Sequence, residues 1–112
     1  MSPLHALLGL LVRGERHGYE LKRIVDEEFG PFWRIDYAQL YRSLARMRRE
    51  EWVKVRVETG RGGPARKVYA LTARGRRAYA AWLTEPPKER DEFFVKLRLA
   101  NQSGISITNL VE

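Results

Sequence analysis

The sequence contains no cysteine. This absence excludes a disulfide framework, a thiolate nucleophile and a metal site built on thiolates. Histidine is scarce as well: His5 and His17 are the only two, and neither belongs to a metal-ligand spacing or to a Ser/His/Asp set. A lone histidine beside a glycine, as in His17-Gly18, is more typical of a turn or a helix cap than of a catalytic base. We therefore expect no enzyme activity, no metal and no cofactor.

Long apolar runs are also missing. No stretch approaches the roughly 18 residues that a transmembrane helix needs, so we expect no contact with a membrane. The first five residues lack the basic segment of a secretory signal. A chain of 112 residues has room for one core and little else. Together these features predict a cytoplasmic protein.

Acidic residues are few in the middle of the chain. The segment 34–77 holds 13 Lys and Arg against four Asp and Glu, a net charge of +9, which leaves −2 on the rest of a chain whose total is +7. A continuous basic segment of this kind is expected of a surface that binds a polyanion. A merely solvated Arg-rich surface would give the same composition. The positions of the cations on the predicted elements have to distinguish the two.

The apolar periodicity predicts helices, then a hairpin, then more helices. The expected helices cover about 2–13, 18–28, 36–51, 72–83 and 90–101, and the expected strands cover about 52–58 and 66–71. This order is that of a winged helix-turn-helix, in which the third helix enters the major groove and the hairpin is the wing. The predicted fold class is α+β, mainly α, with a C-terminal dimerisation helix. We expect a DNA-binding domain over 1–85 and a helical dimerisation segment over 86–112.

The third helix carries the sharpest signal. Asp36 and Gln39 form the pattern of a capping box at its start. At roughly 100° per residue, its apolar stripe leaves four polar residues without an acid within an arc of about 80° on the opposite face. These residues are Gln39, Arg42, Arg46 and Arg49. Arg and Gln suit guanine and adenine edges, so this face is predicted to read DNA. Tyr37 and Tyr41 flank it, either as phosphate or base contacts or as aromatics at the edge of the core.

The predicted hairpin has a basic tip. Glycines at positions 60, 62 and 63 allow a close approach to a ligand, and the neighbouring cations can reach sugar-phosphate or the minor groove. The predicted wing contacts are Arg61, Gly63, Arg66 and Lys67.

The fifth helix is apolar nearly all round and must be buried. We expect a second copy of the same helix to cover it, with Phe93, Phe94 and Leu97 at the dimer interface; the alternative is packing against the chain's own first helix. Residues 105–111 would extend that surface as a helix or a strand. Trp82, near the linker at Pro86-Pro87, is our candidate contact for a planar aromatic effector, with core packing as the alternative.

Several motifs resemble the PadR family of bacterial transcriptional regulators. They are His17-Gly18-Tyr19-Glu20-Leu21, Gly30-Pro31-Phe32-Trp33, Gln39-Leu40-Tyr41, Arg66-Lys67-Val68-Tyr69, Thr72 with Gly75, and Arg90-Asp91-Glu92-Phe93. The resemblance covers roughly residues 4–100. It implies a winged-helix repressor that dimerises through C-terminal helices and is often released from DNA by a small aromatic effector. It also implies DNA contacts at Gln39, Tyr41, Arg42 and Arg46 on the third helix and at Gly63, Arg66 and Lys67 on the wing.

The chain departs from that family in two places. Arg42 stands where relatives usually have proline after the second tyrosine, so their base preference does not transfer. The chain also ends at Glu112, where many relatives continue into a longer helical domain. The leading hypothesis is a homodimer whose recognition helices, about 34–36 Å apart, read a pseudo-palindromic operator in double-stranded DNA. The alternative is a winged-helix adaptor that binds protein or RNA.

Overall fold

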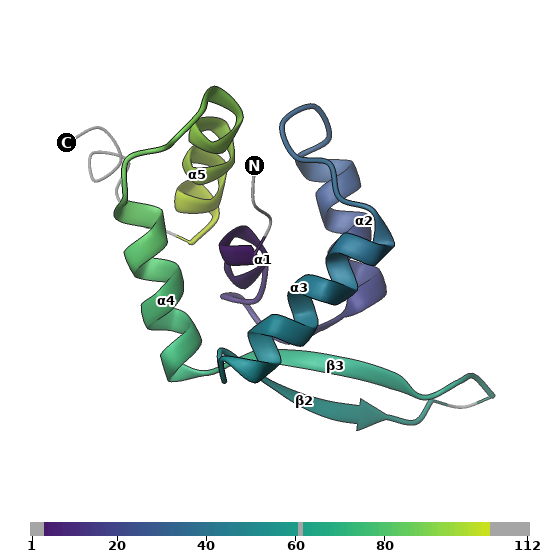
Figure 1. Ribbon diagram of the computed structural model, residues 1–112. Helices are drawn as coiled ribbons and strands as arrows, with labels where there is room; N and C mark the ends of the chain where they lie inside the picture. The colour runs from purple at the N-terminus through teal and green to yellow at the C-terminus, as the bar shows by residue number, and fades with distance from the viewer. Residues whose placement is uncertain (1–3, 61, 104–112) are drawn as a thin grey trace.

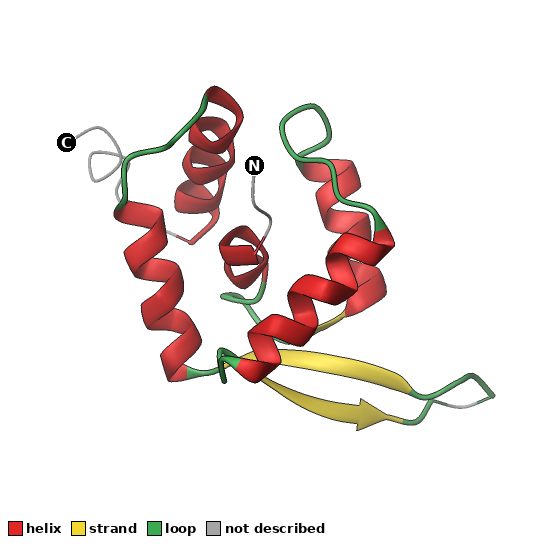
Figure 2. Ribbon diagram, in the orientation of Figure 1, coloured by secondary structure: helices red, strands yellow, loops and turns green. Residues whose placement is uncertain are grey.

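The computed structural model describes residues 4–60 and 62–103. Its helices are α1 (Leu4–Leu10), α2 (Gly18–Glu28), α3 (Tyr37–Arg49), α4 (Ala73–Thr84) and α5 (Arg90–Ser103). Its strands are β1 (Arg16–His17), β2 (Val53–Glu58) and β3 (Arg66–Leu71). This arrangement confirms the predicted fold class and the helix–helix–helix–hairpin order (Figures 1 and 2). The expected start of the first helix at residues 2 and 3 and the extension over 105–111 lie outside the described residues.

The core is built around α1. Leu7, Leu8 and Leu11 are at most 1% exposed. Figure 1 shows α1 enclosed, with α4 and α5 on one side and α2 and α3 on the other. The leucines of this segment are therefore buried on several sides. The hairpin of β2 and β3 projects away from the helices at the bottom of the view.

The described sheet has three antiparallel strands in the order β1-β3-β2. β2 and β3 pair over their full length, from Val53 opposite Leu71 to Glu58 opposite Arg66. β1 pairs only Arg16 with Tyr69 and His17 with Val68. The sequence analysis missed β1, because two residues carry no alternation and this strand exists only through its pairing with β3.

Local capping determines where the helices begin. Asp36 Oδ1 accepts from the Gln39 N–H at 2.7 Å, and Gln39 Oε1 accepts from the Asp36 N–H at 3.1 Å, as the capping box predicted. Thr72 Oγ1 likewise accepts from the Gly75 N–H at 2.9 Å at the start of α4. Gly75 is required there, because a Cβ would lie 2.1 Å from the carbonyl oxygen of Trp52. Helix starts were thus predictable to within about one residue.

The C-terminal helix packs on its own chain. Val95, Leu99 and Ala100 are at most 1% exposed and belong to the same core as α1, against which α5 packs. Packing on the first helix, given above as the alternative, thus accounts for one side of α5. Phe93, Phe94 and Leu97 are only half-buried. The division into 1–85 and 86–112 stays a prediction.

Candidate nucleic-acid interface

The two faces of α3 divide as the helical periodicity predicted. Leu40, Leu44 and Met47 are at most 1% exposed and hold the helix in the core. The four predicted contact residues, Gln39, Arg42, Arg46 and Arg49, are all exposed. None of the three arginines forms an ion pair with another residue of the described ranges. Their charge is therefore available to an external anion.

Gln39 has two possible uses that compete. Its Oε1 already accepts the Asp36 N–H in the capping box. Bidentate pairing with adenine needs the amide oxygen as well as the amide nitrogen. Gln39 can therefore donate from Nε2 while it caps α3, but it must leave the cap to pair with adenine through both atoms.

Two tyrosines extend this surface. Tyr37 and Tyr41 are 45% and 50% exposed, and their rings stack with centroids 6.3 Å apart. Tyr41 lies across the start of α2, so that a Cβ at position 18 would meet its hydroxyl oxygen at 3.1 Å. Gly18 thus lets α2 and α3 approach closely. Both tyrosines lie at the surface rather than in the core.

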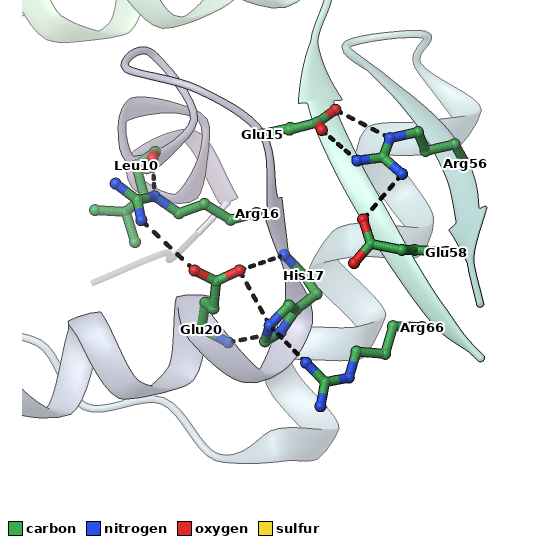
Figure 3. Close-up of polar contacts among 8 residues, drawn as sticks. All are labelled: Leu10, Glu15, Arg16, His17, Glu20, Arg56, Glu58 and Arg66. Carbon is green, nitrogen blue, oxygen red and sulfur yellow. Dashed lines mark hydrogen bonds and ion pairs between the residues drawn. The ribbon is translucent and has the colours of Figure 1, made fainter. Parts of the chain in front are cut away.

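The wing lies beside α3 and carries further cations. Gly63, Arg66 and Lys67 are exposed, whereas Arg61 lies outside the described residues. Nη1 of Arg66 is 3.4 Å from Nε2 of His17 (Figure 3). Neither Arg66 nor Lys67 forms an ion pair within the described chain. They add to the free positive charge on α3.

A groove of about 580 Å³ joins α2, α3 and β3. It is lined by His17, Gly18, Tyr19, Tyr41, Ala65, Arg66, Lys67 and Tyr69. None of these lining residues is acidic. Tyr19 is 65% exposed at its rim, a position that the sequence analysis did not assign to the site. Hydroxyl, imidazole and cationic groups on one concave surface suit the sugar-phosphate backbone of a nucleic acid.

His17 serves as a helix cap rather than a base. Its Nδ1 accepts from the Glu20 N–H, and its own N–H donates to Glu20 Oε1, each at 3.2 Å. Figure 3 shows this reciprocal pair at the start of α2. The other ring nitrogen, Nε2, lies 3.1 Å from Glu20 Oε1. The sequence analysis had favoured a turn or cap at this position, and the cap is confirmed.

Trp82 and the half-buried residues of α5 lie apart from this surface. Trp82 is 9% exposed. The centroids of the Trp82 and His5 rings are 6.1 Å apart, and Lys96 Nζ lies 4.7 Å from the centroid of the Trp82 ring. Burial lowers the pKa of His5. Phe94 stacks on Phe32 with centroids 4.8 Å apart. Effector contact at Trp82 and dimerisation through α5 both stay predictions.

The described residues offer neither a metal site nor a membrane-spanning helix. Within 4–60 and 62–103, no three His, Asp or Glu side chains gather to hold a metal ion. Nor does any helix there combine the length and the apolar character required to traverse a bilayer.

The fold and this surface define a winged helix-turn-helix protein whose third helix and wing both present cations without an ion pair among the described residues. Residues 7–81 match the model of the transcriptional regulator PadR-like family. The chain therefore belongs to the PadR-like family of transcriptional regulators.

The curated relatives of this chain are also named as transcriptional regulators. The chain is 39% identical over 86 residues to a probable transcriptional regulator of Mycobacterium tuberculosis, covering 77% of this chain and 46% of that protein. It is 32% identical over 96 residues to the negative transcriptional regulator PadR of Bacillus subtilis, covering 82% and 53%. It thus spans about half the length of the curated relatives that it matches.

Two crystal structures of Bacillus subtilis PadR are similar to this fold. The complex with operator DNA matches with a TM-score of 0.69 and 31% identity, over 88% of this chain and 58% of that chain. The complex with p-coumaric acid matches with a TM-score of 0.65 and 29% identity, over 91% and 58%.

Proposed function

We propose that this chain is a cytoplasmic transcriptional repressor that binds double-stranded DNA as a homodimer and is released by a small aromatic effector. The observation that carries the proposal is the exposed face of α3, where Arg42, Arg46 and Arg49 have no acidic partner among the described residues. A solvated helix face normally mixes charges of both signs. The operator complex of the Bacillus subtilis relative supports DNA as the partner.

The proposed contacts divide into two kinds. Arg42 and Arg46 would read base edges in the major groove, with Tyr37, Gln39, Tyr41 and Arg49 beside them. Wing residues Arg61, Gly63, Arg66 and Lys67 would hold sugar-phosphate or the minor groove and supply affinity that depends on salt. No catalytic role is proposed for any residue.

Dimerisation would place two recognition helices on successive turns of DNA. Phe93, Phe94 and Leu97, half-buried on α5, are the proposed interface. Sedimentation of the purified chain tests this, with Leu97→Glu as the variant expected to favour the monomer. An unchanged distribution in that variant would place the interface elsewhere.

The effector proposal follows the p-coumaric acid complex of the relative. Trp82, whose ring is near both the His5 ring and Lys96 Nζ, is the proposed reporter of binding. Titration of phenolic acids against tryptophan fluorescence, with bound operator as the second readout, tests it. A flat response over a broad panel would remove the effector from the proposal.

The main experiment is fluorescence anisotropy on a labelled duplex of about 30 base pairs from the chain's own promoter, with a scrambled duplex alongside. Replacing Arg42 or Arg46 by Ala is expected to weaken binding by about 1–3 kcal/mol, or about five- to 150-fold, if each contacts a base. Lys88→Ala is the matched control, because it removes an exposed cation from the α4–α5 linker. Equal losses of DNA affinity in all three variants would indicate that only the net charge of the chain matters. Unchanged binding in both arginine variants would contradict the assignment and favour an adaptor for protein or RNA.

A further inference from the structure

The wing leaves the sheet at a defined row of residues. β1 ends at His17, which pairs with Val68 on β3, and Val68 in turn pairs with Arg56 on β2. This row is the last with three strands, and beyond it only β2 and β3 continue, as far as Glu58 opposite Arg66. A two-stranded ribbon is weakly stable by itself and twists more than a wider sheet. The orientation of the wing therefore depends on what holds it at this row.

Arg56 lies in that row and forms ion pairs with two carboxylates, those of Glu15 and Glu58. Its Nε donates to Glu15 Oε2 at 3.2 Å, and its Nη2 donates to Glu15 Oε1. Its Nη1 lies 3.1 Å from Glu58 Oε2. Glu15 immediately precedes β1, so the contact joins the two outer strands across β3 (Figure 3). Val68, between them in the row, is 5% exposed.

These charges are arranged unlike those elsewhere on the wing. Arg66 and Lys67 have no ion pair within the described chain, whereas Arg56 is outnumbered by two carboxylates. The guanidinium lowers the pKa of Glu15, mainly through the hydrogen bond. Acidic groups beside a polyanion oppose binding, so Glu15 and Glu58 do not help DNA affinity through charge. Half-exposed ion pairs also add little to stability. A role in holding the wing in position accounts for the pairing of Arg56 with Glu15 and Glu58.

We propose that Arg56, clamped between Glu15 and Glu58, sets the angle at which the wing leaves the sheet and thereby positions the wing cations for DNA. The effect on DNA binding rests on the proposed function, whereas the effect on the wing angle does not. Bidentate Arg–carboxylate pairing fixes direction as well as distance, which a single Lys contact would not do.

Glu15→Gln distinguishes a role in positioning the wing from a simple charge effect, because the two predict opposite changes in DNA affinity. The variant removes one negative charge from the chain, so electrostatics alone predicts tighter DNA binding. Loss of the clamp predicts weaker binding, about threefold or more, with a smaller salt slope because wing phosphate contacts are lost. Glu27→Gln is the matched control, since Glu27 is exposed on α2 without an ion pair in the described chain. Binding in Glu15→Gln as tight as in this control would overturn the proposal.

A double-mutant cycle separates the clamp from a direct contact of Arg56 with DNA. If the clamp acts, Glu15→Gln and Arg56→Gln each weaken binding, and the double variant is no weaker than Arg56→Gln alone. If Arg56 touches DNA itself, its loss weakens binding by the same factor whether or not Glu15 is present. Unchanged melting temperatures in all variants would show that the effect is not a loss of fold.

The wing angle can also be measured without DNA. Because the chain has no cysteine, spin labels can be attached at Thr59→Cys on the wing and Ala81→Cys on α4, both exposed sites. Double electron–electron resonance is expected to give a narrow distance distribution that broadens or shifts with Glu15→Gln. An unchanged distribution would refute the clamp. Failure of the wild-type chain to bind DNA, together with a broadened distribution, would instead refute only the proposed function.

Discussion

Replacing Lys96 tests how α5 is fixed to the rest of the fold. Lys96 is 1% exposed, and its Nζ donates to the carbonyl oxygen of Glu85 at 2.6 Å. The same atom lies 3.3 Å from Glu92 Oε1, and Glu92 is itself 7% exposed. The ammonium thus joins the end of α4 to the first turns of α5. Its removal would leave a carboxylate and a carbonyl facing a site with little water.

The expected loss follows from that burial. Breaking a buried pair by removing one partner costs about 3–5 kcal/mol, because the other charge stays buried. Native domains are stable by only about 5–15 kcal/mol, so Lys96→Met should lower the urea midpoint greatly. Glu92→Gln should cost less, since Lys96 keeps its contacts with Glu85 and with the ring of Trp82.

The double variant determines whether the two charges are coupled. Lys96→Met with Glu92→Leu replaces the pair by apolar groups and should recover most of the loss, apart from the unpaired carbonyl of Glu85. The assay is urea unfolding followed by circular dichroism and tryptophan fluorescence, at several protein concentrations to account for association. A loss below about 1 kcal/mol in Lys96→Met would refute this reasoning. So would a double variant whose loss equals the sum of the losses measured for Lys96→Met and for Glu92→Leu alone.

Two other changes have defined outcomes. Glu51, two residues after the end of α3, has a left-handed φ of 61° that favours glycine. Glu51→Gly should therefore raise the free energy of unfolding by about 1 kcal/mol, measured by urea unfolding, and a decrease would contradict the strain argument. Burial lowers the pKa of His5 from its ordinary 6.5, against an opposing effect of Glu85, so the folded state binds this proton more weakly than the unfolded state. The contribution of His5 to stability is therefore full above pH 6.5 and is lost as the pH falls toward the folded pKa. Comparing wild type with His5→Phe at pH 7.5 and pH 5.5 checks this, and a difference that does not change with pH would disprove it.

The predictable parts of this fold are those that depend on near neighbours. The capping box at Asp36 involves a residue three positions away and formed as predicted, and Thr72 caps α4 over the same short distance. The buried stripe of α3 repeats within single turns, so its burial could be worked out from spacing alone. The candidate recognition face followed, because the residues opposite the stripe had to be exposed. Its role in binding DNA stays a proposal.

The parts that the sequence could not show depend on distant partners. The composition of the basic segment predicts Arg56 to be one more free cation, but it pairs with Glu15, 41 positions earlier. β1 likewise forms only because β3 lies beside it. Gln39 was predicted both to cap α3 and to contact DNA, and only the structure shows that the two uses share one oxygen atom. Neither pattern nor composition specifies such pairings.

The apolar residues of α5 illustrate the same limit and restrict the proposed dimer. An apolar pattern shows that a helix is covered but not by what. Here the chain's own core buries Val95 and Leu99, which leaves Phe93, Phe94 and Leu97 as the half-buried apolar residues proposed for the interface. Phe94 stacks on Phe32, which is four positions before the cap of α3 at Asp36. In the proposed dimer, a partner seated on these residues would therefore contact the aromatic pair that borders the segment leading into α3.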